Sequence, residues 1–351
     1  MKATLIILSF IFSLQTLAQV TVRDSETKCP IPYAQVFDNE GHLICYTNSE
    51  GTLENNTIKV SELTIRQMAY EPKTIHWDNL TEDTIYLVPT TYKIGNVDVV
   101  AKKADYIRLE GYFRSYQLND SCMKYYQDGI IEFYIPLNKK GHIERNILNK
   151  RFLQSDSLIK RDKKRSFSLI DQYTTYPFLE KSNLYQKINS TYKLDKHQNY
   201  DIICNNSDTL GYILRNYKDS TIRIEFDNLY PQRNKTTNMF GYVQKLSPFY
   251  ITEIYNGLGN DYESYIDLQC RKMYRKFMFS HKKEHYQQTI DVFDELFITG
   301  KTLITKEEKK EARHKREDNH YSNIIKYRDL YDISSLAPAL ENSVNKMINS
   351  K

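Results

Sequence analysis

The spacing closest to a catalytic motif is an H-x-x-E-H pattern formed by His281, Glu284 and His285. On a helix, this spacing would place two imidazoles on one face as zinc ligands, with the carboxylate available as a base. The flanking segments RKFMFS and TIDVFDELF alternate as strands do, so the motif would lie at the polar tip of a hairpin. We therefore expect a solvated turn here, and a zinc-dependent hydrolase is the weaker alternative.

A zinc site at this motif would also need a third ligand from a distant part of the chain. The residues that could supply it are Glu295, Glu307, Glu308, Glu311 and His314. Their spacing singles out none of them. His314 and His320 are six residues apart, which is not the spacing of two ligands on one helical face.

Other catalytic patterns are missing from the sequence. It contains no G-x-S-x-G, no P-loop and no G-x-G-x-x-G motif. Acid pairs such as Asp291 and Asp294 fit an ordinary strand and turn, so glycosidase chemistry has no support. We expect no catalytic residue and no cofactor.

The chain that would position any site is predicted to be mainly β. Residues 20–101 form short alternating segments bounded by the glycine turns NEGH and SEGTL, which is typical of an Ig-like or transthyretin-like β-sandwich. The 29 tyrosines and 15 phenylalanines also favour strands.

Residues 102–351 are predicted to form a larger antiparallel sheet with helical insertions. Strand-like segments occur at 125–137, 165–179, 208–217, 220–230, 239–257, 265–281 and 289–300. Ile222, Ile224 and Phe226 share one face, with Arg223 and Glu225 on a face that we expect to meet water. Helices are predicted at 144–165 and at 334–350 after Pro338, and the charged segment 304–319 fits a solvated helix or a loop.

Three segments of the first region resemble a known family. DSETKCPIPYAQVFDNEGHLICYTNSEGTL, LTIRQMAYEPKTI and TIYLVPTTYKIGNVDVVAKK occur in this order. They resemble the carboxypeptidase-regulatory-like β-sandwich of exported Bacteroidetes envelope proteins. Met68-Ala69-Tyr70 departs from the family, which has glycine before the tyrosine.

The resemblance implies a stalk or accessory module and no peptidase activity. It predicts a sandwich over residues 19–101, followed by an uncharacterised β-rich domain over 102–351. A curved sheet resembling that of bacterial lipoprotein carriers would fit the strand count of the second domain, by analogy of shape alone.

The first residues predict export. Met1-Lys2 is a short positive start, an uncharged apolar run follows, and Ala18 is a suitable cleavage site that would leave Gln19 as the new N-terminus. The alternative is a retained membrane anchor, but the apolar run of about fifteen residues is shorter than the roughly twenty that span a bilayer. We expect a signal peptide at 1–18, no transmembrane span in the mature chain, and a location in the periplasm or at the outer membrane.

Composition limits the partners further. The formal net charge of +5 is small for 351 residues, and an exported protein does not meet nucleic acid, so the partner would be an envelope protein, a glycan or a lipid. Five cysteines leave at least one unpaired within the chain; Cys29 and Cys45 could form a bridge, although small buried residues are the simpler interpretation.

Two surface patterns remain open. The basic residues Lys160, Arg161 and 163–165 could touch anionic head groups or form a solvated helix end. Four Asp-Ser/Thr-x segments resemble acceptor sites of Bacteroidetes O-glycosylation, although such pairs also end turns. They begin at Asp83, Asp156, Asp208 and Asp219.

The sequence thus favours a non-catalytic envelope binding or structural protein. The first alternative is a carrier that holds an apolar ligand or lipid in a cavity of the second sheet.

Overall fold

A computed structural model describes most of the chain. The described residues are 19–53, 58–67, 70–90, 104–138, 141–163, 172–206, 208–229, 232, 234–239, 241–258, 264–281, 286–314 and 323–350. The chain divides into two compact units, Met1–Thr90 and Thr91–Lys351. The predicted signal peptide at 1–18 and the predicted domain boundary at 101 lie outside the described residues. Over the part that is described, no helix has both the length and the apolar character to cross a bilayer.

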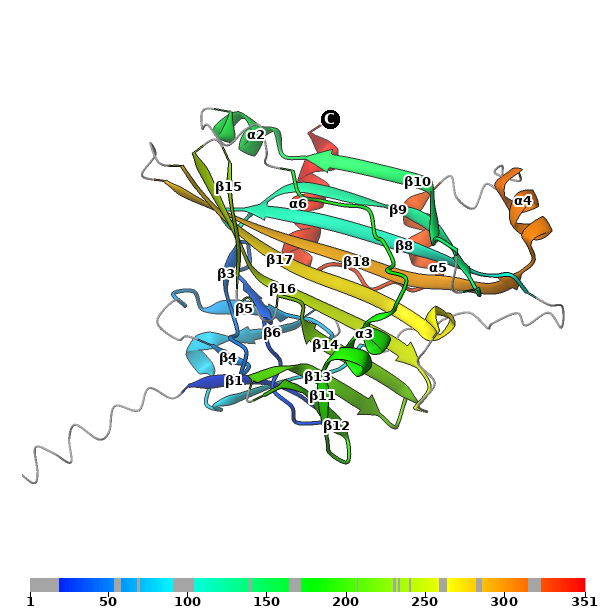
Figure 1. Ribbon diagram of the computed structural model, residues 1–351. Helices are drawn as coiled ribbons and strands as arrows, with labels where there is room; N and C mark the ends of the chain where they lie inside the picture. The colour runs from blue at the N-terminus through cyan, green and yellow to red at the C-terminus, as the bar shows by residue number, and fades with distance from the viewer. Residues whose placement is uncertain are drawn as a thin grey trace, which may run out of the picture. The chain divides into compact units, whose positions relative to one another are not determined.

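The first unit contains two small sheets (Figure 1). One has the strand order β4-β1-β7, and its strands are β1 (Val20–Asp24), β4 (Thr52–Leu53) and β7 (Thr84–Leu87). The other has the order β3-β2-β5-β6, and its strands are β2 (Gln35–Phe37), β3 (Leu43–Tyr46), β5 (Glu62–Arg66) and β6 (Lys73–His76). A short 3-10 helix, η2 (Trp77–Asn79), follows β6.

A buried carboxylate joins distant parts of the first unit. Asp24, at the end of β1, accepts hydrogen bonds from the backbone amides of Glu26 at 2.7 Å and Thr27 at 2.8 Å. It also accepts one from the hydroxyl of Tyr70 at 2.9 Å.

The two predicted glycine turns are present, because Gly41 and Gly51 have φ values of 85° and 72°, which glycine adopts without strain.

The second unit is built on one eleven-stranded sheet in which all the pairings are antiparallel. Its order is β10-β9-β8-β18-β17-β16-β14-β13-β12-β11, and β15 pairs with β16. The strands are β8 (Tyr106–Asn119), β9 (Cys122–Pro136), β10 (Glu144–Gln154), β11 (Lys193–Lys196), β12 (Tyr200–Asn205), β13 (Asp208–Asn216), β14 (Thr221–Asp227), β15 (Lys235–Met239), β16 (Tyr242–Asn256), β17 (Leu268–His281) and β18 (Gln287–Ile304). The predicted mainly-β fold class with a few helices is therefore confirmed.

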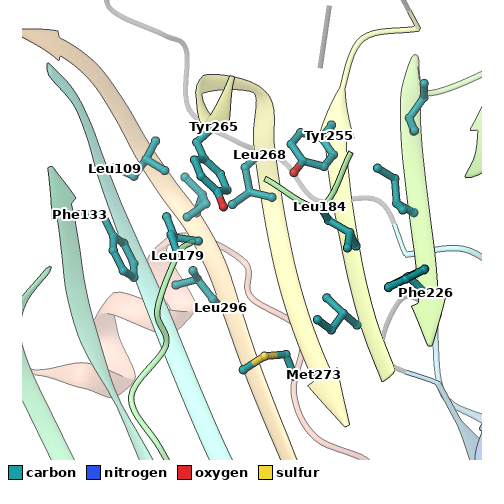
Figure 2. Close-up of a cluster of buried hydrophobic side chains, with 14 of the residues drawn as sticks. Leu109, Phe133, Leu179, Leu184, Phe226, Tyr255, Tyr265, Leu268, Met273 and Leu296 are labelled. Carbon is teal, nitrogen blue, oxygen red and sulfur yellow. The ribbon is translucent and has the colours of Figure 1, made fainter. Parts of the chain in front are cut away.

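One face of this sheet carries the main hydrophobic core. Residues 172–183, which we call the strap, and helix α3 (Leu184–Thr191) lie against it together with the 3-10 helix η4 (Tyr265–Asp267). Figure 2 shows Leu179 of the strap beside Leu296 of β18. Leu184 and Ile188 of α3 are four residues apart and therefore point to the same side, where both are buried.

The opposite face is covered by the C-terminal helices α5 (Ile324–Leu330) and α6 (Pro338–Asn349), which contact β9 and β10 (Figure 1). The hydroxyl of Tyr327 on α5 lies 2.5 Å from that of Thr299 and 2.8 Å from the Glu110 carboxylate. Helix α6 begins at Pro338, as predicted. Two further short helices, α2 (Asp156–Asp162) and α4 (Lys306–His314), follow β10 and β18.

The helix predicted over 144–165 is wrong for its first half. Residues Glu144–Gln154 form strand β10 at one edge of the sheet, and within the described part of the range, which ends at residue 163, the helix is Asp156–Asp162. A bulge between Ile147 and Asn149 shifts the pairing of β10 with β9 by one residue. Because the bulge interrupts the two-residue alternation, the apolar residues no longer show a strand period in the sequence.

Two other expectations for the second unit also fail. Arg223 and Glu225 were expected to face water, but both are buried, and they form an ion pair with an Nε–Oε1 distance of 3.3 Å. The segment 165–179 was expected to be a strand. Its described part, 172–179, belongs to the strap and pairs with no strand as a ladder.

Two glycines of the second sheet provide a test of this packing. A methyl group on Gly129 would lie 2.2 Å from the carbonyl oxygen of Asn149 and 2.8 Å from the Phe113 ring. At Gly300, the nearest atom would be at an ordinary 3.5 Å. We expect Gly129→Ala to lower the free energy of unfolding by about 1–3 kcal/mol or more through overpacking.

The matched variant Gly300→Ala should change the free energy of unfolding by less than about 1 kcal/mol. Urea unfolding of both variants and the wild type measures the difference. Equal stability of the two variants would contradict the close contact between β9 and β10.

Candidate ligand-binding site

Side chains of the sheet hold the strap in place. The backbone amide of Tyr173 donates to Gln117 Oε1 at 2.7 Å, and the amide of Thr175 donates to Ser115 Oγ at 3.3 Å. Arg145 donates to the carbonyl oxygens of residues 176 and 177 at 3.2 and 2.9 Å. These contacts satisfy the backbone of a segment that crosses the sheet without joining it.

A buried ion pair lies beneath the first half of the strap. Arg275 Nη2 lies 2.6 Å from Asp294 Oδ2, and the hydroxyl of Ser115 donates to the same carboxylate at 2.5 Å. Arg275 also donates to the Tyr173 carbonyl oxygen at 3.3 Å. The strap therefore sits on a charge pair that would be uncompensated if either partner were removed.

A second buried carboxylate holds the start of α3. Glu253 Oε2 accepts the backbone amide of Leu184 at 3.2 Å and a hydrogen bond from Tyr255, while Oε1 accepts one from Arg271 at 3.0 Å. Burial alone would lower the pKa of the Arg271 guanidinium, but Glu253 outweighs it and the pKa is raised. Asn183 completes the helix start through a capping box with Gln186.

A pocket of about 610 Å³ remains beside α3 at the end of the covered face. Ile107 at the start of β8 and Ile135 at the end of β9, which pair directly, belong to its apolar side. The other lining residues are Pro136, Leu137, Asn138, Gly141, Ile143, Lys181, Ser182, Gln186, Ser190, Ser264 and Tyr265. The pocket thus has an apolar side from the sheet and a polar side from the strap, α3 and η4.

The Tyr265 ring links the pocket to the core. It lies beside Leu268 in Figure 2, and its hydroxyl donates to the carbonyl oxygen of Glu180 at 2.9 Å. Burial, with a further contribution from Glu253, raises the pKa of Tyr265 well above its ordinary value. This hydroxyl is therefore a neutral structural donor that fixes the end of the strap.

The proposed zinc motif lies only partly within the described residues. His281 ends β17, and its ring centroid is 4.4 Å from that of Tyr242 on the paired strand. Glu284 and His285 lie outside the described residues. Of the possible third ligands, Glu295 is fully buried and bonded to Arg114, and the side chain of Glu308 accepts the Thr305 amide at 2.8 Å.

Within the described residues, no three His, Cys, Asp or Glu side chains are grouped as metal ligands. Asp291 and Asp294 are three residues apart on β18 and so point to opposite faces of the sheet. Asp291 is buried, which raises its pKa, and it accepts a hydrogen bond from Tyr274 at 2.6 Å. These two carboxylates do not form an acid pair.

The basic segment at 160–165 contains one paired residue and two exposed ones in its described part. Arg161 pairs with Asp162 at 2.7 Å and with Asp120 at 3.4 Å, whereas Lys160 and Lys163 are exposed. Residues 164 and 165 lie outside the described part.

Among the cysteines, Cys29 and Cys270 are buried and the other three are partly exposed.

The hydroxyl residues of the four Asp-Ser/Thr segments differ in exposure. Thr84 is half-buried, and the other three are exposed: Ser157, Thr209 and Ser220. Whether they are glycosylated stays a prediction.

No family model matches this chain, and no curated protein is similar to it. The function is therefore inferred from the site itself.

The pocket residues were not predicted from the sequence. Asn183-Leu-Tyr-Gln186 has the spacing of a capping box, and this signal could have located α3. The contact of α3 with strands more than fifty residues away leaves no local signal, so Lys181 and Ile107 could not have been brought together from sequence.

A buried amine lies on the pocket side of the sheet. Lys301 of β18 pairs with Leu109, is 3 % exposed, and its Nζ has no hydrogen-bond partner among the described residues. Burial lowers its pKa to about 8, and the nearby carboxylate of Asp267 opposes this shift only in part. At neutral pH the folded chain therefore buries a charged ammonium at a cost.

The cost predicts a pH dependence of stability. Between pH 8 and about 10.5, Lys301 loses its proton in the folded state but keeps it in the unfolded state, so the free energy of unfolding rises with pH. We expect Lys301→Met to be more stable than the wild type by about 2–3 kcal/mol at pH 7, and this difference to shrink as the pH approaches 10.

Urea unfolding at pH 7, 8, 9 and 10 measures this difference. Lys310→Met, at an exposed position on α4, is the control and should show a small difference that does not change with pH. A constant difference for Lys301→Met across the series would contradict the buried amine.

Proposed function

We propose that this chain is a non-catalytic binding protein of the cell envelope, and that its second unit holds the apolar part of a small ligand in the pocket beside α3. The pocket carries the proposal. Its volume of about 610 Å³ lies within the roughly 300–1,000 Å³ common for small-molecule sites. Its combination of aliphatic side chains and a few polar groups is also typical of such sites.

The filled core limits how much ligand the sheet could take up. The strap and α3 already occupy the face between β8 and β14 with Leu179, Leu184 and Ile188. A carrier that used this whole face would have to displace them. The proposal therefore places the ligand in the pocket alone.

Export and the accessory role of the first unit belong to the same proposal. The apolar run before Ala18 supports secretion. The resemblance of residues 24–53, 63–75 and 84–103 to the regulatory-like sandwich supports an accessory module, and the two small sheets of the first unit fit that module.

A tryptophan at the pocket rim tests the proposed site. Ser190 lines the pocket, whereas its exposed neighbour Thr191 does not. We expect Ser190→Trp to fill the pocket and weaken binding of the neutral apolar probe N-phenyl-1-naphthylamine at least tenfold, while Thr191→Trp binds as the wild type does. Fluorescence titration of the purified chain measures both affinities.

Thermal unfolding of each variant checks that the fold is intact. Absence of saturable probe binding in the wild type, or equal binding by both variants, would overturn the pocket as the binding site and leave a structural role.

A further inference from the structure

One charged side chain, a lysine, lines the described part of the pocket. Lys181 is the only charged residue among the described lining residues, and no carboxylate lines the pocket with it. The neighbouring Glu180 is not among the lining residues, and its carboxylate is 4.0 Å from Arg271. The pocket therefore favours a negative group over a positive one.

Most other polar groups of the pocket already have partners within the chain. Tyr265 donates to the Glu180 carbonyl oxygen, Asn138 accepts the Gly141 amide at 3.1 Å, and Ser190 donates to the Lys187 carbonyl oxygen at 3.1 Å. Ser264 accepts the amide of Ile266 at 3.2 Å. These bonds use the hydroxyl donors of Tyr265 and Ser190, whereas Asn138 and Ser264 accept and keep N–H and O–H donors of their own.

Among the donors that remain, Lys181 carries the only positive charge, and Ser182 is its neighbour in the lining. Both are exposed, and neither forms a side-chain hydrogen bond or ion pair with another described residue. The amide of Leu184, at the start of α3, is already bound by Glu253, and that of Gln186 by Asn183. An anionic head would therefore be attracted to Lys181, with Ser182 beside it, and not to the helix terminus.

The opposite side of the pocket suits a hydrocarbon chain. Ile107 and Ile135 form a cross-strand pair, and Ile143 lies beside them in the lining. Leu137 is 48 % exposed, a large aliphatic side chain left uncovered at the pocket. A ligand chain placed here would remove this apolar surface from water, which is the main source of affinity for such ligands.

We infer that the pocket binds a single-chain amphiphile with an anionic head, the chain against Ile107 and Ile135 and the head at Lys181 and Ser182. A pocket of this volume suits a ligand of drug size and so one chain with its head. This inference rests on the proposed function and names its ligand class. A carboxylate and a phosphate head share the chemistry that Lys181 and Ser182 recognise.

Four ligands with the same chain and different heads test the inference. Calorimetric titration of the full mature chain with decanoate, decyl phosphate, decanol and decyltrimethylammonium compares the heads at constant chain length. We expect the two anions to bind about three- to tenfold tighter than decanol, and the cation to bind more weakly than decanol. The preference for anions should fall as salt is raised from 0.01 to 1 M, because salt screens exposed charges.

Variants of two lysines identify the charge responsible. Lys181→Gln should remove the preference for the anions and leave the affinity for decanol unchanged. Lys196→Gln, at an exposed position on β11 outside the pocket lining, is the matched control and should keep the preference. The relative affinities of decanoate and decyl phosphate decide which anion is the natural head.

Chain length gives an independent readout. Each methylene added between octyl and decyl phosphate should tighten binding about fourfold, because burial of each methylene contributes a similar free energy.

The outcomes separate this inference from the function on which it rests. Binding of all four ligands with equal affinity, or an anion preference that survives Lys181→Gln, would overturn the anionic head and keep the pocket. Failure of every ligand, including decanol, to bind would overturn the binding function itself.

Discussion

Charged side chains lie buried on both faces of the second sheet, and the opposite charges beside them permit those faces to be covered. Arg114 and Glu295 form such a pair beneath the C-terminal segment, where Arg114 also donates to the Ser334 carbonyl oxygen at 2.8 Å. Burial alone would lower the pKa of Arg114, but Glu295 outweighs it and the pKa is raised. An unpaired charge at this depth would cost several kcal/mol. Each segment that covers the sheet is therefore held at the ion pair beneath it.

The same constraint determines where the pocket forms. The Arg275–Asp294 pair holds the first half of the strap, and Glu253 holds the start of α3. Between these fixed points the covering segments fill the sheet with aliphatic side chains. Helix α3 has only eight residues, and the space beside it, where β8 begins and β9 ends, remains open. The strap and α3 thus define the binding site as much as the strands of the sheet do.

The sequence predicted strands well where alternation was local. The segments predicted at 208–217, 220–230 and 265–281 contain the strands β13, β14 and β17, and Ile222, Ile224 and Phe226 share the core face. The prediction from sequence failed where tertiary contacts override the local pattern. The bulge in β10 gave a strand the apolar spacing of a helix. Alternation put Arg223 and Glu225 on one face, but it did not show that this face is buried.

The candidate site was less predictable than the fold. Only the general idea of a cavity on the second sheet came from the sequence, and it rested on strand number and an analogy of shape. The H-x-x-E-H motif at 281–285 is represented in the described residues by His281 alone, whose ring packs on Tyr242. Lys181 and Ser182 belong to an irregular segment, where no periodicity indicates which strands it crosses.

The position of β10 at the end of the strand order has a consequence for self-association. A long terminal strand is a template to which a second copy could add by backbone pairing, the route by which many β proteins aggregate. In β10, Arg145 and Lys150 would bring positive charges to an identical strand, and the bulge after Ile147 interrupts the straight run of donors and acceptors. The strand edge therefore disfavours fibril growth.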